Sequence, residues 1–181
     1  MKIKKLPELF EISFKKVKRQ ELLDFLKLCI KYRSRLFCED FYKHNFSSPT
    51  KFLRFIKDMK DCIYCINIGK NSKIKAFIYL YDFKKAYQGT FDAKVTFCVE
   101  REYWGFGSFA IAKKGLKFLF EEIKIRKLSA EIIGENTLAK SLLNKLGFEL
   151  EAVLIKECVE QGKAKNLYIY SKFNPAYEFC G

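Results

Sequence analysis

The apolar positions in the first third of the chain predict one strand followed by helices. Residues 10–17 (FEISFKKV) have the pattern of a short strand, and residues 19–34 repeat apolar side chains at helical spacing. A second helix should run from Ser48 to Met59, because Ser is a good N-cap and Pro49 is tolerated in the first helical turn. The side chains expected on one face of the first helix are Leu22, Leu23, Leu26 and Ile30.

The rest of the chain alternates strands with two further helices. Strands are expected at residues 61–69, 73–83, 89–100, 127–134, 148–159 and 165–173. One helix should follow Gly107, and a shorter one should run from Asn136 to Leu146 and end at Gly147, which readily takes the left-handed conformation. Turns are expected at Gly69-Lys70-Asn71 and at Glu160-Gln161-Gly162-Lys163. The predicted order is βααβββαβαββ, in a single domain spanning residues 1–181.

Composition fits one soluble globular domain. Of the 181 residues, 49% are hydrophobic and 31% are charged, which excludes a disordered chain. The net charge of +14 favours anionic ligands, but the basic residues are spread along the chain, so a nucleic-acid-binding arm is not expected. The basic N-terminus lacks the apolar stretch of a secretory signal, and no later run reaches membrane-spanning length. We therefore expect a cytoplasmic protein without membrane association.

The cysteines and the histidine do not indicate a metal site. The seven cysteines have no regular spacing and read as reduced core thiols. Cys62 and Cys65 form a CxxC within an expected strand, where residues three apart point to opposite faces. The single histidine, His44, has no partners for a triad or a zinc site. The glycosylation triplet Asn45-Phe46-Ser47 reads more simply as a loop.

The segment from Trp104 to Ser108 (WGFGS) is the strongest candidate for a binding loop. It leads from a predicted strand directly into a basic amphipathic helix, with glycines at 105 and 107. Glycines allow a close backbone approach, and the free amides at a helix N-terminus bind phosphate. Taken alone, the segment could equally be an ordinary turn into a surface helix.

A second segment makes this signal specific. E-Y-W-G-x-G is followed after about 30 residues by N-x-x-A-x-x-x-L-x-K-L-G-F, beginning at Asn136, and together these motifs resemble the GNAT superfamily of N-acetyltransferases. The likeness is greatest to the branch of ribosomal-protein alanine, spermidine and amino-sugar acetyltransferases, and covers residues 89–173 best. It implies an α/β (α+β) GNAT-like fold, with a mixed, mostly antiparallel sheet of six to seven strands and about four flanking helices.

The resemblance also implies a cofactor, acetyl-CoA, and positions that would bind it. The loop amides would hold the pyrophosphate, the strand before the loop would edge the pantetheine, and the helix after Asn136 would pass beside the cofactor. Asn136 could instead serve only as a helix N-cap, or do both. The implied cofactor-binding residues are Phe97, Cys98, Val99, Trp104, Gly105, Phe106, Gly107, Ser108, Asn136, Lys140 and Asn144.

Glu131 is the candidate general base. It lies in an otherwise apolar strand, where desolvation would raise the pKa of a carboxyl toward neutrality, although it could also point to water at a strand edge. Some relatives in this branch use a strand carboxylate at this place. The alternative carboxylates Asp92, Glu100 and Glu102 are better explained as surface charges.

Three positions depart from the superfamily pattern. Leu143 stands where many members carry the tyrosine that protonates the leaving thiolate, so Tyr168 or Tyr170 on the last strand, or water, would have to supply that proton. Either tyrosine could equally have only a structural role. Lys94 stands where many members have Glu, and Phe109 stands where the loop usually ends in Gly or Ala and could crowd the pyrophosphate.

The function implied is transfer of an acetyl group from acetyl-CoA to a primary amine of a small molecule, such as an amino sugar, or of a protein N-terminus. The positive charge favours an acidic acceptor over a polyamine. The alternative is a catalytically silent GNAT-fold module that binds CoA or a partner protein, and a basic nucleic-acid-binding domain is a more distant third. The sequence leaves open whether the protein is a homodimer.

Overall fold

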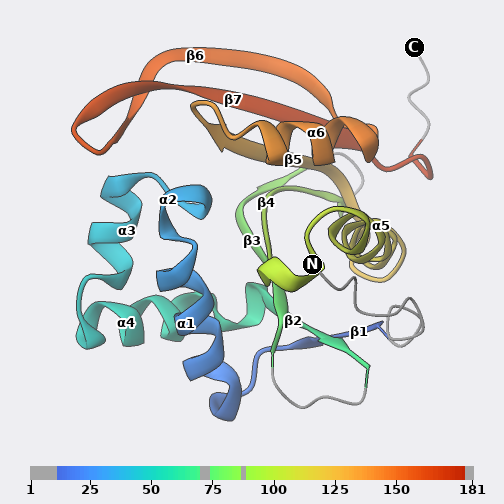
Figure 1. Cartoon of the computed structure of the whole chain (residues 1–181). Helices are drawn as coiled ribbons and strands as arrows, with labels where there is room; N and C mark the ends of the chain where they lie inside the picture. Colours follow the sequence, from blue (N-terminus) through green and yellow to red (C-terminus); the bar gives the residue numbers. More distant parts are fainter. Residues whose placement is uncertain (1–11, 70–73, 87–88, 178–181) are drawn as a thin grey trace.

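The computed structural model describes residues 12–69, 74–86 and 89–177, and its centre is a single seven-stranded sheet (Figure 1). The strands lie in the order β1-β2-β3-β4-β5-β7-β6, and every neighbouring pair is antiparallel except β4 and β5. This confirms the mixed, mostly antiparallel sheet. The strands are β1 Ile12–Lys16, β2 Ile63–Ile68, β3 Ala76–Lys85, β4 Phe91–Val99, β5 Ile125–Ile133, β6 Glu149–Glu160 and β7 Lys163–Phe173.

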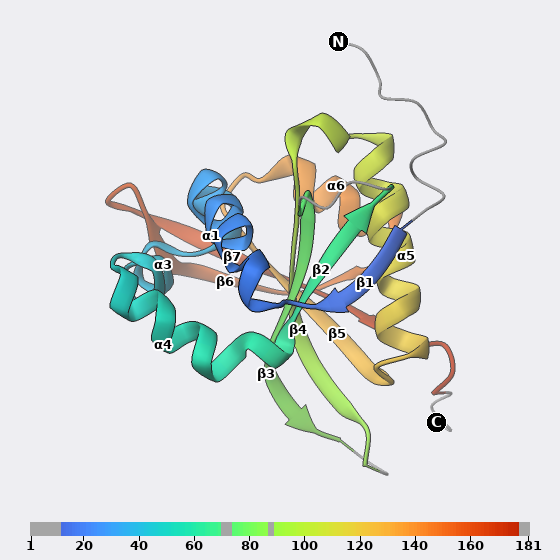
Figure 2. The ribbon, with the colours of Figure 1, turned by 90° about the horizontal axis from the view of Figure 1, so that it is seen from below.

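Helices cover both faces of this sheet. Figure 2 shows the helices of the first third of the chain on one side of the central strands and the two later helices on the other. The first group is α1 Leu22–Lys31, α2 Arg33–Leu36, α3 Glu39–Phe46 and α4 Pro49–Met59. The second group is α5 Phe106–Glu121 and α6 Thr137–Lys145. Each face therefore has its own core.

The two cores differ in composition. The core beneath α5 is mainly aliphatic, with Ile78, Leu80 and Ile111 almost completely buried. The core beneath α1–α4 is aromatic: the ring centroids of Phe46 and Phe55 lie 4.9 Å apart. Aromatic rings at this separation stabilise a core beyond the area that they bury. Much of the phenylalanine content thus serves the packing of one helical layer.

The buried face of α1 matches the expected one only in part, since Leu22 and Leu26 pack against the core but Leu23 and Ile30 do not. Leu23 and Ile30 are 60% and 46% exposed, whereas Phe25 and Cys29 are completely buried. This helix carries apolar residues on two overlapping faces, and both have helical spacing. The face with the large aromatic side chain packs against the sheet, because it buries more apolar area.

The segment between α1 and α4 contains helical structure that the sequence pattern did not reveal. The chain forms the short helix α2 and then α3, so Asn45 and Phe46 lie in the last turn of a helix and not in a loop. His44 is exposed on α3. The start of α4 agrees with the prediction, since the Ser48 hydroxyl accepts a hydrogen bond from the Lys51 amide at 3.3 Å.

The last two strands form a long hairpin at the edge of the sheet. Gln161 and Gly162 both have positive φ, 50° and 71°, and make the tight turn expected between the strands. Figure 1 shows the hairpin reaching across the molecule toward α3. The expected turn at Gly69-Lys70-Asn71 lies partly outside the described residues. Among the residues that the structure describes, no helix combines the length and apolar character needed to cross a membrane.

Candidate functional site

Strands β4 and β5 run side by side for only part of their length. Their parallel pairing begins at Phe91 and Ile125 and ends at Lys94 and Ser129. Beyond this point β4 stays paired with β3, and β5 stays paired with β7, so the two strands diverge. Along the gap, no other strand of the described residues pairs with the facing edge of either strand. Unpaired backbone N–H and C=O groups of this kind can bind an extended ligand as though it were another strand.

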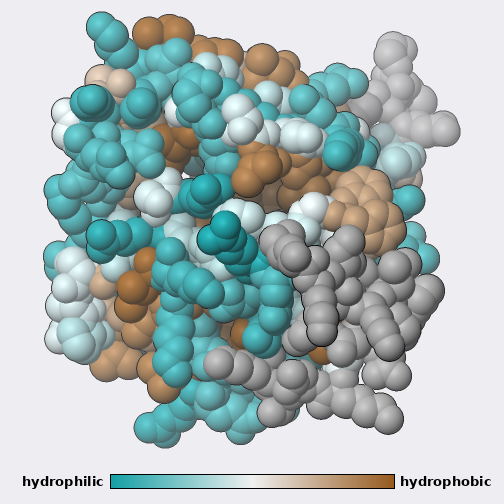
Figure 3. Space-filling view, viewed as in Figure 1, coloured by the Kyte–Doolittle hydropathy of each residue, from teal (hydrophilic) through white to brown (hydrophobic). Residues whose placement is uncertain are grey.

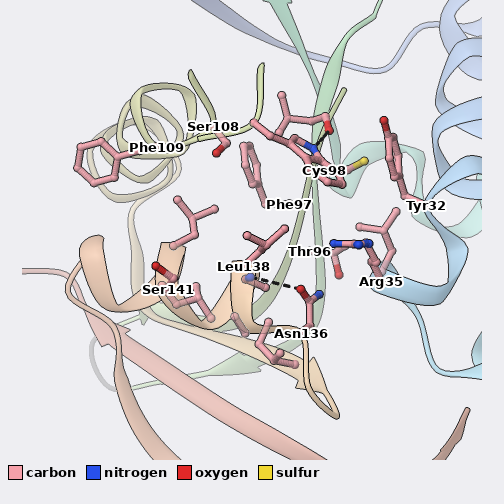
Figure 4. Close-up of a pocket in the computed structure, with 18 of the residues that line it drawn as sticks. Tyr32, Arg35, Thr96, Phe97, Cys98, Ser108, Phe109, Asn136, Leu138 and Ser141 are labelled. Atoms are coloured by element: carbon pink, nitrogen blue, oxygen red, sulfur yellow. Dashed lines mark hydrogen bonds between the residues drawn. The ribbon is translucent and has the colours of Figure 1, made fainter. Parts of the chain in front are cut away.

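A cavity of about 660 Å³ lies in this gap. Its walls come from β4 and β5, from the start of α5, from α6, and from the α1–α2 segment (Figure 4). In the space-filling view, hydrophobic side chains gather in a hollow beneath α6 (Figure 3). The lining combines apolar residues such as Val95, Ile132 and Leu142 with a small number of polar and charged groups. This combination is typical of small-molecule sites.

The loop that closes one end of the cavity has the geometry of an anion site. Gly105 is the N-cap of α5, with φ +85° and ψ −124°, a conformation that side-chain-bearing residues rarely adopt. The helix begins at Phe106, so Gly107, which was predicted to precede the helix, lies in its first turn. The first amides of the helix have no acceptor within it, and the helix dipole adds positive potential there. The backbone from Gly105 to Ser108 therefore presents free donors beside the cavity.

Trp104 anchors this loop to the rest of the protein. Its indole N–H donates to the carbonyl of Val99 at 3.1 Å, and its ring lies 5.9 Å from that of Tyr32 in α1–α2. The loop is thereby tied both to the end of β4 and to the opposite helical layer. Phe109 also lines the cavity, and its ring extends from α5 on the side away from Ser108 (Figure 4).

Asn136 lies at the other side of the gap, at the start of α6. Its side-chain oxygen accepts a hydrogen bond from the Ala139 amide at 3.3 Å, and the residue also lines the cavity. The N-cap role is therefore confirmed. Because the side chain is in the wall, it can serve as a cap and contact a ligand.

Glu131 lines the cavity from β5. The prediction of apolar surroundings for its carboxylate is wrong, because both oxygens have polar partners. One oxygen is 2.7 Å from Nζ of Lys94, and the other accepts a hydrogen bond from the Tyr81 hydroxyl at 3.2 Å. Lys94 also pairs with Asp82 at 2.9 Å. Lys94 thus binds two carboxylates at the point where β4 and β5 diverge.

The pKa shifts around Glu131 follow from these contacts. Burial would lower the pKa of Lys94, but the hydrogen bonds to Glu131 and Asp82 outweigh it and raise that pKa. Burial and then the charge of Glu131 raise the pKa of Tyr81 well above its ordinary value. Lys94 therefore stays an ammonium and Tyr81 a neutral hydroxyl, so both remain hydrogen-bond donors to Glu131.

Comparison with solved structures identifies the architecture. A spermidine N-acetyltransferase from Vibrio cholerae, solved with CoA and spermine, superposes with a TM-score of 0.73 over 91% of this chain and 96% of its own, at 13% identity. A ribosomal-protein-S5-alanine acetyltransferase from Vibrio fischeri gives 0.70 over 92% and 95%, at 15% identity. A GNAT-family acetyltransferase from Bacillus anthracis gives 0.68 over 90% and 95%, at 14% identity. The chain has the GNAT fold. No protein-family profile and no curated protein sequence matches it significantly.

Most of the cofactor-binding positions implied by the resemblance line this GNAT-fold cavity. They are Phe97, Cys98, Val99, Trp104, Gly105, Phe106, Ser108 and Asn136. The side chain of Cys98 is buried in the aromatic core, so its contribution to the wall is mainly backbone. Burial raises the pKa of its thiol far above the usual range, which makes it unreactive.

Four other candidates do not line the cavity: Gly107, Lys140, Asn144 and Tyr168. Lys140 lies on a different side of α6, where its Nζ is 3.3 Å from the centroid of the Tyr168 ring. Asn144 is exposed, and Tyr170 is buried in the core beneath α5 and α6. The geometry of this GNAT fold thus gives no support to Tyr168 or Tyr170 as the proton donor.

The competing carboxylates of the fourth strand are bound elsewhere. Asp92 accepts two hydrogen bonds from the Arg126 guanidinium. Glu100 accepts hydrogen bonds from Lys31 at 2.6 Å and from the Tyr32 hydroxyl at 2.9 Å. Burial would raise the pKa of Glu100, but these two donors lower it. Neither carboxylate lines the cavity, whereas Glu131 does.

No motif identified the residues of the wall that α1 and α2 form. Tyr32, Arg35 and Leu36 all line the cavity. They precede the loop motif at Trp104 by more than 50 residues, and they belong to no motif of their own. Their contribution depends on long-range packing that only the structure reveals.

Proposed function

We propose that this protein is an N-acetyltransferase that moves an acetyl group from acetyl-CoA to a primary amine. The observation that supports it most directly is the gap between β4 and β5, which opens after Lys94 and leads to the free amides at the start of α5. The GNAT-fold proteins compared above include one solved with CoA and spermine. A catalytically silent binding module is the alternative.

The cavity fits such a cofactor. Its volume of about 660 Å³ is within the range of cofactor sites. The amides from Phe106 to Ser108 would bind the pyrophosphate, and the free edge of β4 at Phe97–Val99 would pair with the pantetheine. Apolar residues such as Ile132 and Leu142 would cover its methylene groups. Acetyl-CoA would supply an activated acetyl thioester at the end of the gap near Asn136.

The residues around Glu131 would prepare the amine. An ammonium must lose a proton before its nitrogen can form the new C–N bond, and Glu131 is the carboxylate in the cavity wall that could accept it. Lys94 and Tyr81 would hold that carboxylate in place through the contacts described above.

The departing thiolate must also take up a proton. Leu143 is apolar and cannot supply it. Among the described residues that line the cavity, the one tyrosine is Tyr32, and its hydroxyl already donates to Glu100. We therefore assign the second proton to water.

Two measurements test the function. Calorimetry should show saturable binding of acetyl-CoA, and a thiol-release assay with a panel of primary amines should show turnover above the amine-free rate. Saturable binding without turnover of any amine would favour the silent module. Absence of acetyl-CoA binding would contradict both.

The Gly105→Ala variant is expected to bind acetyl-CoA about tenfold more weakly, because holding a non-glycine residue in a disfavoured backbone conformation costs about 1–3 kcal/mol. No atom lies within 4 Å of an added Cβ, so the effect should come from the backbone angle of +85° and not from a clash. Calorimetric titration measures it directly.

Gly162→Ala is the matched control for this variant. Gly162 also has positive φ, 71°, and open space around its Cβ position, but it lies in the β6–β7 turn. This variant should lose stability while keeping its acetyl-CoA affinity. Equal weakening by both variants would indicate a general loss of native structure and would contradict the role given to the loop.

A further inference from the structure

Arg35 is a charged residue of the cavity wall that the proposed chemistry does not use. It comes from α2, and Figure 4 shows its guanidinium directed into the space between Thr96 and Cys98. The side chain is exposed, and no carboxylate within the described part of the chain forms an ion pair with it. A cation with its donors directed into a cavity can bind an anionic ligand there.

A stacking contact holds this guanidinium in place. Its central carbon lies 5.0 Å from the ring centroid of Trp104, which is itself hydrogen-bonded to Val99. Stacking of this kind orients the guanidinium plane and leaves its N–H edges free for a planar anion. Arg35 is therefore preorganised.

The charges nearby do not neutralise Arg35. Glu100, which directly follows β4, is already engaged by Lys31 and by the hydroxyl of Tyr32. That hydroxyl also accepts a hydrogen bond from the Arg101 amide at 2.9 Å, and the Arg101 guanidinium lies 5.9 Å from the Trp104 ring. This side of the cavity is thus positively charged, as is the whole chain at +14.

The acidic group of the cavity lining comes from β5. Glu131, on β5, is the one acidic residue among the described residues that line the cavity. Lys145 adds a further cation from α6. A ligand that bridges Arg35 and Glu131 would carry an anionic group at one end and an ammonium at the other. A polyamine would place a cation next to Arg35, which is unfavourable.

We propose that Arg35 binds a carboxylate or phosphate of the acceptor, so that the substrate is an amine carrying an anionic group. This inference rests on the proposed function, because it gives the acceptor the amine that Glu131 would deprotonate. The hydrogen-bonded ion pair would form in a partly enclosed cavity, where it is stronger than on an open surface.

The experiment compares amines that differ by one anionic group. Phenylalanine is assayed against phenylalaninol, and 2-aminoethyl phosphate against ethanolamine, so the two pairs separate carboxylate from phosphate recognition. In the wild type we expect kcat/KM to be about 10- to 100-fold higher for the anionic member of at least one pair, the effect of one charge-assisted hydrogen bond. Arg35→Gln should abolish this preference, and Arg35→Glu should shift it toward spermidine.

Arg33→Gln is the matched control, since Arg33 lies on the same short helix but stacks at 5.6 Å on Tyr42 and is not in the cavity lining. It should keep the wild-type preference. Acetyl-CoA affinity should change less than about twofold in Arg35→Gln. A loss of cofactor affinity equal to the loss of acceptor preference would mean that Arg35 serves the cofactor, and this would overturn the proposal.

A direct binding measurement separates this inference from the proposed function. The CoA-loaded protein is titrated with the same four amines, whether or not turnover is seen. If the anionic amines bind in an Arg35-dependent manner without turnover, the anion site stands and the transferase assignment fails. If amines are acetylated with no preference for the anionic member, or with a preference that Arg35→Gln leaves intact, the transferase assignment stands and the anion site is wrong.

Discussion

Replacing Glu131 by Gln is expected to lower kcat by about 10²- to 10⁴-fold, the usual contribution of a general base. The amide is close in size to the carboxylate and can still accept the hydrogen bond from Tyr81. It cannot take a proton from an ammonium at neutral pH. Thiol release at saturating acetyl-CoA and amine, measured from pH 6 to 10, gives the effect. Affinity for acetyl-CoA should change little.

Asp82→Asn is the matched control for Glu131→Gln. Asp82 is the other carboxylate bound to Lys94, at 2.9 Å, but it does not line the cavity. Each substitution removes one negative charge from the same cluster, and only that of Glu131 removes a carboxylate from the cavity wall. We expect the Asp82 variant to keep kcat within about threefold, as for a surface substitution.

Two results would contradict the assignment of Glu131. Equal losses in both variants would mean that the charge balance around Lys94 matters and that no proton passes through Glu131. Unchanged turnover of Glu131→Gln across the whole pH range would leave water, or the amine's own deprotonation in solution, as the source of the neutral nucleophile.

The parts of the site that could be predicted from sequence are those set by local backbone chemistry. Gly105 marks the loop because only glycine readily adopts its backbone angles, and Asn136 marks the start of α6 because its side chain caps the helix. Both effects act within four residues. They leave a recognisable pattern in the sequence even at 13–15% identity to the solved structures.

The rest of the site depends on contacts between distant segments. Lys140 and Asn144 follow Asn136 at helical spacing, yet α6 turns them away from the cavity and presents Ala139 and Leu143 to it. The spacing of residues predicts a helix, but it does not predict which face of that helix lines the cavity. The same reasoning explains why Arg35 was not a candidate. Its place in the wall depends on how α1 and α2 pack against the sheet.

The sequence pattern and the observed packing disagree most clearly about which face of α1 is buried. Phe25→Ala is therefore expected to cause the largest loss of stability. Phe25 is completely buried, and its ring lies 4.7 Å from that of Phe77 in an edge-to-face contact. Removing a buried aromatic ring lowers the free energy of unfolding by about 3–5 kcal/mol, because the loss of hydrophobic burial adds to the cost of the cavity left behind. Urea denaturation with linear extrapolation gives the change in unfolding free energy.

Leu23→Ala is the matched comparison, since Leu23 lies two residues away on the face that the sequence pattern favours but is 60% exposed. Leu23→Ala should lower the free energy of unfolding by no more than about 0.5 kcal/mol. If Phe25→Ala does not fold, Phe25→Leu retains most of the buried volume and should still cost more than Leu23→Ala. The opposite ranking would mean that α1 packs through its leucine face. Because α1 leads directly into Tyr32 and Arg35, rotating it would also remove both side chains from the cavity, so this stability measurement independently tests the wall on which the anion site depends.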